Sequence, residues 1–346
     1  MFPTSHHRAG FCRARAFFFA AFLVLIASNF ICTLARAEHF KIGVLRLGQA
    51  GPVFIAQEKG YFAAEGLDTE VVLFDAAQPI AVAVASGDLT FGATALTAGL
   101  YSLGGQGALR IVAGMNRYHA NFHSVAYLVS NRAWDLGLKS FKDFGGRTVA
   151  VTQIGSGYHY SLALITAKYG VDLKSVRVLP VQTMPNIASA LIGNQADAAL
   201  LATTPATPLI DQHKAHLLGW VDDETPWQNG SVFVATKTAT GRRDLVERFL
   251  RAFRKGTREY HDAFTGPDEK PKEGPNIREV AGFIAKYTGE PLETAMKGDA
   301  YVDAEARLDV KDVLRQIDWY IGQNMLKGPI NGDALIDKSY VVPLAH

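Results

Sequence analysis

Cysteine is nearly absent from this sequence. Its two cysteines, Cys12 and Cys32, lie among the first 37 residues, so the rest of the chain offers no disulfide, thiolate metal site or cysteine nucleophile. Long apolar runs are also scarce. The most apolar one, residues 16–28, is shorter than the roughly 20 residues that a helix needs to cross a bilayer. Stability must therefore come from a buried core, which a chain of 346 residues is long enough to form.

The N-terminal residues have the pattern of an export signal. Three arginines precede the apolar run, and the small-residue motif Ala35-Arg36-Ala37 follows it. We expect cleavage after Ala37 and a mature protein in the periplasm. An uncleaved anchor is the alternative, whereas lipoprotein processing at Cys32 is disfavoured by the bulky Ile31 before it.

The sequence also has no large excess of positive or negative charge. The formal net charge of the whole sequence is +2, but the first 37 residues carry four arginines and no acid, so the mature chain is slightly acidic. This balance gives no reason to expect nucleic acid or an anionic membrane surface as a partner.

The remaining sequence alternates short β-rich runs with helical patterns, which predicts βαβ units in two α/β lobes. The first series of strands covers 40–47, 70–74, 90–94 and 109–115, and the second covers 148–152, 176–181, 196–202 and 216–221. A shift of 106 residues superimposes the two series, placing Gly51 on Gly157 and Thr97 on Thr203. We therefore predict a structural duplication that forms two Rossmann-like lobes.

Two extended segments, 122–129 and 231–236, are predicted to join the lobes as a two-strand hinge. Lobe 1 would comprise residues 38–125 and 235–346, with a helical C-terminal part, and lobe 2 would comprise residues 126–234. Such a hinge predicts closure about a bound ligand. We expect the mature chain to be a monomer.

Four sequence segments resemble one protein family. They are GPVFIAQEKGYFAAEGLDTEVVLF, AVASGDLTFGAT, FKDFGGRTVAVTQIGSGYHYSLALI and ASALIGNQADAALL. In order they resemble the sulfonate, nitrate and thiamine-precursor family of periplasmic substrate-binding proteins. The resemblance implies the type II periplasmic binding protein fold, and it implies delivery of a solute to the permease and ATPase of an ABC importer.

Candidate ligand contacts follow from the predicted fold, because ligands of open parallel sheets bind beyond the carboxyl ends of the strands, near helix starts. Four turns qualify, and each could also be an ordinary structural turn. Their residues are Gln49, Ala50 and Gly51; Thr94, Ala95 and Thr97; Ser156, Gly157 and Tyr158; Thr203 and Thr204. Further candidates are Asn116, Arg117 and Tyr118 near the hinge, and Met184.

The turn Gly155-Ser156-Gly157 is the most informative of the four. Two glycines and a serine before a helix can cradle a carboxylate or sulfonate, whereas the Lys-Ser/Thr ending of a nucleotide-binding loop is missing. Arg117 is a natural counter-ion for an anion, and Thr94 or Thr97 is expected both to cap a helix and to contact the ligand. We predict a small organic anion as ligand: a sulfonate, a carboxylate, or an aromatic or heterocyclic acid.

Catalytic and metal motifs are not found. Ser156 is not in the G-x-S-x-G motif of a serine hydrolase. The one close histidine pair near the hinge is His119 and His123, and it is not part of an H-E-x-x-H zinc motif. A strand there would nevertheless point both side chains the same way. We predict a binding protein without catalytic residues, metal or cofactor. An enzyme on the same scaffold and a receptor for a sensor kinase are the alternatives.

Overall fold

The computed structural model describes residues 38–298 and 300–345. The predicted export signal, with its cleavage motif at 35–37 and both cysteines, lies outside these residues. Among the described helices, none combines the length and apolar character needed to cross a membrane.

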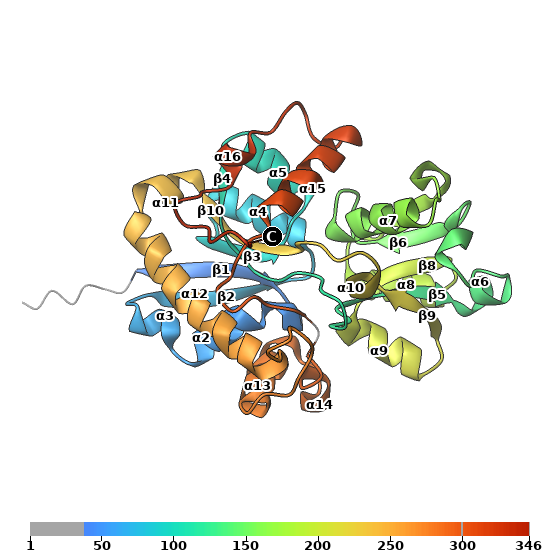
Figure 1. The fold of residues 1–346 in the computed structure, drawn as a ribbon, viewed down its shortest axis with the longest axis horizontal. Coiled ribbons are helices and arrows are strands. Elements are labelled where there is room, and N and C mark those ends of the chain that lie inside the picture. The colour runs from blue at the N-terminus through green and yellow to red at the C-terminus, as the bar shows by residue number, and fades with distance from the viewer. Residues whose placement is uncertain (1–37, 299, 346) are drawn as a thin grey trace, which may run out of the picture. The chain divides into compact units, whose positions relative to one another are not determined.

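The first five-stranded sheet contains the first four strands and one late strand (Figure 1). Its order is β2-β1-β3-β10-β4, and only β10 runs antiparallel to its neighbours. The strands are β1 (His39–Leu45), β2 (Asp68–Phe74), β3 (Phe91–Ala95), β4 (Leu109–Gly114) and β10 (Gly230–Ala235).

The second sheet has the same plan. Its order is β7-β6-β8-β5-β9, again with a single antiparallel strand, β5, between the third and fifth positions. The strands are β5 (Val125–Ser130), β6 (Thr148–Val151), β7 (Arg177–Pro180), β8 (Ala198–Ala202) and β9 (Ala215–Trp220). All eight βαβ strands predicted from the sequence are present to within a few residues.

Helices connect the strands of each sheet. In the first half they are η1 (Gly48–Ala50), α2 (Gly51–Glu58), α3 (Tyr61–Ala64), α4 (Ala77–Ser86) and α5 (Ala98–Gly105). In the second half they are α6 (Asn131–Asp135), η2 (Phe141–Phe144), α7 (Gly157–Lys168), η3 (Leu173–Ser175), α8 (Met184–Ile192), α9 (Thr203–Asp211) and α10 (Val221–Glu224).

The predicted duplication is confirmed by strand register. Parallel partners in the first sheet recur in the second sheet at positions 106 residues later. The pairs are Ile42–Val71 and Gly43–Gly92 in the first sheet, and Thr148–Arg177 and Val149–Ala198 in the second. The helices α2 and α7 begin at Gly51 and Gly157, which differ by the same number.

The chain crosses between the sheets at 115–124 and 221–229, which differs from the predicted connecting strands. Residues 125–130 belong to the second sheet and residues 230–235 to the first, so the second crossing ends before the predicted lobe boundary at 235. The crossings pair with each other: the amide of Tyr118 donates to the carbonyl of Trp227 over 2.9 Å. Left-handed backbone at Asn121 and His123 keeps residues 121–123 out of β5.

The C-terminal helices pack mainly on the first half (Figure 1). They are α11 (Thr236–Gly241), α12 (Arg243–Phe264), α13 (Ile277–Thr288), α14 (Leu292–Ala295), α15 (Val310–Gly322) and α16 (Gly332–Leu335). Phe249 on α12 stacks on Phe91 of β3 with ring centroids 3.8 Å apart, as expected for the apolar face of an amphipathic helix. On α15, Tyr320 donates to the carbonyl of Ser156, so this helix also touches the start of α7.

Candidate functional site

A pocket lies where the carboxyl ends of strands from both sheets meet, and we call it the cleft pocket. Its lining residues are Leu45, Gln49, Asp75, Ala76, Ala77, Ala95, Thr97, Tyr118, Thr152, Gln153, Ser156, Gly157, Tyr158, Met184 and Asn229. Its volume is about 40 Å³, which holds only a few water molecules.

Helix starts converge on this pocket. Ala76 precedes α4, Thr97 caps α5, Ser156 caps α7 and Met184 begins α8. The first amides of a helix have no intrahelical acceptor, and the helix dipole places partial positive charge there. The pocket thus presents backbone donors from both halves of the chain without requiring a basic side chain.

The turn before α7 requires its glycines. Gly155 has φ of +77°, and a Cβ at this position would lie 2.7 Å from the Cβ of Ala98. A Cβ on Gly157 would lie 3.0 Å from the Trp227 ring. Ser156 caps the helix by accepting a hydrogen bond from the His159 amide over 3.3 Å. Because Ser156 occupies the N-cap position, the first turn of α7 begins at the pocket, and the Gly157 amide has no acceptor within the helix.

His159 lies in the first turn of α7. Its side chain is buried, and burial lowers its pKa to about 4. Nδ1 accepts a hydrogen bond from the Gly155 amide over 3.1 Å, as a neutral imidazole can. His159 therefore braces the turn and does not pair with the Ser156 hydroxyl.

Two buried amide side chains form one wall, and a third supports them from behind. Gln49 Oε1 accepts from Asn116 Nδ2 over 2.7 Å and from Asn229 Nδ2 over 2.8 Å. Gln49 and Asn229 line the pocket, whereas Asn116 lies behind them. No described residue bonds to Gln49 Nε2, and Asn229 Oδ1 is buried without a partner in the described part of the chain. A solute with complementary groups could satisfy this donor and this acceptor.

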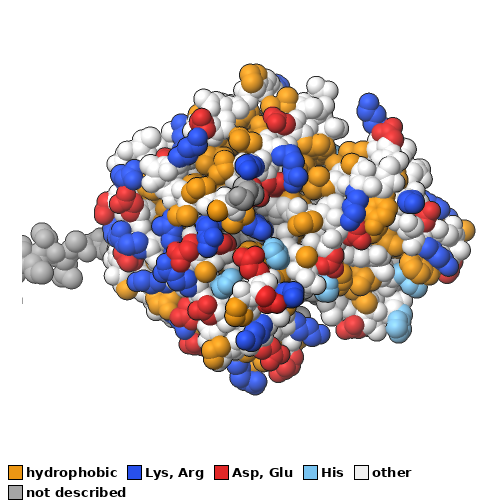
Figure 2. Space-filling view, viewed as in Figure 1, with side chains coloured by type: hydrophobic (Ala, Val, Ile, Leu, Met, Phe, Trp, Pro, Cys, Tyr) orange, Lys and Arg blue, Asp and Glu red, His pale blue; other side chains and the backbone are white. Residues whose placement is uncertain are grey.

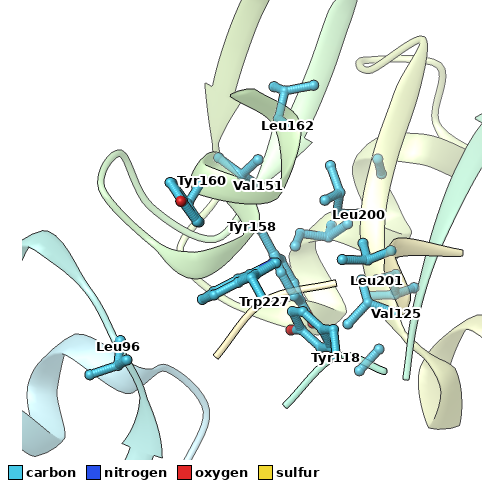
Figure 3. Close-up of a cluster of buried hydrophobic side chains, with 14 of the residues drawn as sticks. Leu96, Tyr118, Val125, Val151, Tyr158, Tyr160, Leu162, Leu200, Leu201 and Trp227 are labelled. Atoms are coloured by element: carbon cyan, nitrogen blue, oxygen red, sulfur yellow. The ribbon is translucent and has the colours of Figure 1, made fainter. Parts of the chain in front are cut away.

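Aromatic and thioether groups form the opposite wall. Tyr118 and Tyr158 are both buried, and Tyr158 Oη lies 3.9 Å from Met184 Sδ. Trp227 packs edge-on behind Tyr118, with ring centroids 5.1 Å apart (Figure 3). Its Nε1 donates to Ser161 Oγ, so Trp227 is a packing residue that supports the wall. This wall suits a planar or apolar solute body.

Charge is sparse at the site. Asp75, which is exposed, is the one charged residue that lines the cleft pocket. It also lines an adjoining apolar pocket of about 200 Å³ together with Arg46, Phe74 and Pro205. On the face drawn in Figure 2, basic and acidic side chains are interspersed, and no continuous basic patch is seen there.

Eight of the residues predicted from the sequence are brought together in the cleft pocket. They are Gln49, Ala95, Thr97, Tyr118, Ser156, Gly157, Tyr158 and Met184. Of the two threonines predicted as caps, Thr97 caps α5, accepting from the Leu100 amide over 3.1 Å.

The other predicted residues lie elsewhere. Ala50 and Thr94 are buried in the core, and Gly51 packs so closely on Tyr260 that a Cβ would lie 2.6 Å from the ring. Thr203 bonds to the carbonyl of His123, and Thr204 donates to Glu290 over 2.8 Å. Asn116 supports Gln49, and Arg117 lines a separate pocket described below.

Sequence reasoning missed several lining residues. They are Leu45, Asp75, Ala76, Ala77, Thr152, Gln153 and Asn229. Asp75 to Ala77 follow β2, so the rule of strand carboxyl ends applied to that strand would have found them. Asn229 lies on the second crossing, at 221–229, whereas the sequence pattern predicted that crossing at 231–236.

His119 and His123 do not lie on a strand. His119 stacks on Tyr301 with ring centroids 4.6 Å apart, whereas His123 Nε2 lies 3.0 Å from Asp223 Oδ2. The turn between them and the left-handed backbone at His123 point the two rings to different partners. In the described residues no group of three or more His, Cys, Asp or Glu side chains could hold a metal ion.

A family comparison decides the classification. The model of the family described as NMT1/THI5 like matches residues 48–270, more than half of the chain. The chain belongs to this family. The resemblance seen in the sequence is thereby confirmed, and the matched range includes every lining residue of the cleft pocket except Leu45. A search of curated protein sequences found no significant match.

Solved structures show that this family member has the periplasmic binding protein fold. The alkanesulfonate-binding protein SsuA from Xanthomonas axonopodis pv. citri, bound to MOPS, has a TM-score of 0.69 at 16% identity, covering 86% of this chain and 97% of that one. The aliphatic sulphonate-binding SsuA from Escherichia coli has a TM-score of 0.66 at 16% identity, covering 88% and 98%. The nitrate-binding protein NrtA from Synechocystis PCC 6803 has a TM-score of 0.69 at 14% identity, covering 88% and 87%.

Proposed function

We propose that this protein is an extracytoplasmic solute-binding protein that captures a small organic anion in the cleft pocket. The solute would be a sulfonate, a carboxylate, or an aromatic or heterocyclic acid. The observation that carries the proposal is the convergence of helix starts from both halves of the chain on one pocket. The structural neighbours named above bind alkanesulfonate, aliphatic sulphonate and nitrate, and all of these are anions.

In this proposal the anionic group lies at the Gly157 amide, beside the Ser156 hydroxyl. The solute body packs between Tyr118, Tyr158 and Met184, where apolar atoms dominate. Gln49 and Asn229 supply a donor and an acceptor for a polar substituent. Asp75 disfavours a second negative charge on its side of the pocket, so we propose a monoanion.

Capture by closure is supported by contacts between the halves. The Ala98 amide donates to the Gly155 carbonyl over 2.9 Å, and Thr204 donates to Glu290 over 2.8 Å. With a pocket of about 40 Å³, this conformation is closed, and solute entry requires these contacts to open. We propose that lobe 1 (38–125 and 235–346) and lobe 2 (126–234) rotate about the two crossings. The crossings begin and end where the strands of the two sheets end and begin.

We propose export to the periplasm after cleavage at Ala37, function as a monomer, and delivery of the solute to the permease and ATPase of an ABC importer. The structural neighbours described as periplasmic binding proteins support the periplasmic location. A receptor feeding a sensor kinase would use the same pocket, and a binding assay with the purified permease and ATPase separates the two partners. An enzyme is disfavoured because the hydroxyl of Ser156 has no imidazole base beside it: His159 bonds to Gly155 instead.

A thermal-shift screen followed by calorimetry tests the ligand class. The panel is ethanesulfonate, benzoate, nicotinate, nitrate, bicarbonate and choline, each with the mature chain. We expect saturable stabilisation by an organic anion that is recovered unchanged after incubation. Stabilisation by nitrate, bicarbonate or choline alone would overturn the ligand class, and chemical conversion of a bound solute would overturn the binding-protein role.

A further inference from the structure

The largest cavity described here is not the cleft pocket. It has a volume of about 370 Å³, and we call it the crossing pocket. Its lining residues are Arg117, Tyr118, Pro226, Trp227, Asp309, Lys311, Asp312 and Arg315. The first four come from the two crossings, and the last four from the start of α15.

Two cations in this pocket lack an acidic partner. Arg117 is half-buried, and its guanidinium lies 5.4 Å from the centroid of the Tyr301 ring, with no carboxylate of the described residues within ion-pair distance. Lys311 likewise makes no ion pair with any described residue. A bidentate oxyanion partner stabilises a half-buried guanidinium. No carboxylate of the described residues fills this role for Arg117.

The two carboxylates of the pocket are already engaged. Asp312 is buried and accepts from the Gln228 amide over 2.7 Å and from Gln316 Nε2 over 2.8 Å, and it pairs with Arg315. Asp309 caps α15 by accepting from the Asp312 amide over 3.0 Å. Asp312 offsets Arg315, so Arg117 and Lys311 bring two positive charges to the pocket against the single carboxylate of Asp309.

We propose that the crossing pocket is a second binding site, for a small oxyanion of the sulfate or phosphate type held between Arg117 and Lys311. This site does not depend on the proposed function of the cleft. Tyr118 lines both pockets, so an occupant of the crossing pocket contacts a wall of the cleft pocket.

Titration with sodium sulfate tests the site, with sodium chloride at equal ionic strength as the salt control. Tryptophan fluorescence reports on Trp227, which lines the pocket. The test variant is Arg117→Gln/Lys311→Gln. The matched control is Arg132→Gln/Lys214→Gln, which removes the same two charges from exposed positions of the second half. A third protein, Ala76→Trp, fills the cleft pocket and leaves the crossing pocket unchanged.

We expect saturable sulfate binding by the wild type, by the matched control and by Ala76→Trp. Affinity should fall by about tenfold or more in Arg117→Gln/Lys311→Gln, the loss of two charge-assisted contacts. Equal responses of the test variant and the matched control would overturn the proposal. Loss of sulfate binding in Ala76→Trp would assign the anion to the cleft pocket and overturn it as well.

Discussion

The backbone amide of Ala98 donates a hydrogen bond to the carbonyl oxygen of Gly155 over 2.9 Å. Ala98 begins α5 in the first half of the chain, and Gly155 precedes α7 in the second. The bond joins two helix starts across the cleft pocket, and the missing side chain of Gly155 permits the approach. One backbone contact thus ties the two halves of the chain together beside the pocket.

Gly155→Ala should destabilise the protein more than a matched glycine substitution. Gly170 has a similar φ of +71°, but a Cβ there meets nothing within 4 Å. Gly170→Ala should cost about 1 kcal/mol of unfolding free energy, the backbone penalty alone. Gly155→Ala adds a clash with Ala98 and should cost roughly 2 kcal/mol or more. Urea unfolding measures both, and equal losses would show that the approach of Ala98 is not fixed.

Two buried helix caps separate stability from binding. Ser156 caps α7 at the cleft pocket, and Ser130 caps α6 by accepting from the Ala133 amide over 3.2 Å. Replacing either by alanine should lower unfolding free energy by about 1 kcal/mol. Only Ser156→Ala should also weaken solute binding, by about tenfold, in calorimetry. A similar change of affinity in both variants would remove Ser156 from the binding site.

Glu290 accepts hydrogen bonds from Thr204 across the halves and from Thr288 within the first half, over 2.8 and 3.1 Å. If the Thr204 contact forms only on closure, Thr204→Val should raise the solute dissociation constant by about threefold to tenfold. Thr288→Val removes a contact present in both conformations and should leave affinity near the wild-type value. Calorimetry on both variants decides this, and the reverse ranking would contradict the closing role.

Asp222 predicts a pH dependence of stability. Its carboxylate accepts from the Ser124 amide over 2.7 Å and from Ser124 Oγ over 2.6 Å, linking the two crossings. Burial raises the pKa of Asp222 to about 7, well above its ordinary value of 3.8. The folded state therefore binds this proton more tightly than the unfolded state, so the stability contributed by Asp222 is full below about pH 4 and is lost as pH rises toward about 7.

Denaturant unfolding of the wild type and Asp222→Asn at pH 5 and pH 8 measures this effect. The stability of the wild type relative to the variant should be greater at pH 5. A difference that stays constant, or that grows toward pH 8, would show that Asp222 is ionised throughout.

The sequence predicted the elements of this fold because their signals are local. The alternation of β-rich runs with helical patterns located the strands, and turn residues such as Gly157 and Thr97 repeated with the strands. The first crossing was misplaced because residues 122–124 contain no glycine or proline to separate them from the apolar residues 125–129, while the left-handed backbone at His123 is not visible in composition.

The site was predictable only where local chemistry determines it. Ser156 and Gly157 were identified because a helix start after a glycine-rich turn is a sequence feature. Arg117 was assigned to the cleft by charge alone, and its actual pocket depends on how α15 packs against the crossings. That packing joins residues almost 200 positions apart, and no local pattern encodes it.

The central claim is that the cleft pocket binds the solute, and calorimetry on two tryptophan variants tests it most directly. Ala76 is half-buried at the pocket with an extended backbone, whereas Ala64 is exposed on α3. With the solute selected by the panel, Ala64→Trp should bind as the wild type does, and Ala76→Trp should give no binding heat while remaining folded. Wild-type affinity in folded Ala76→Trp would contradict the account.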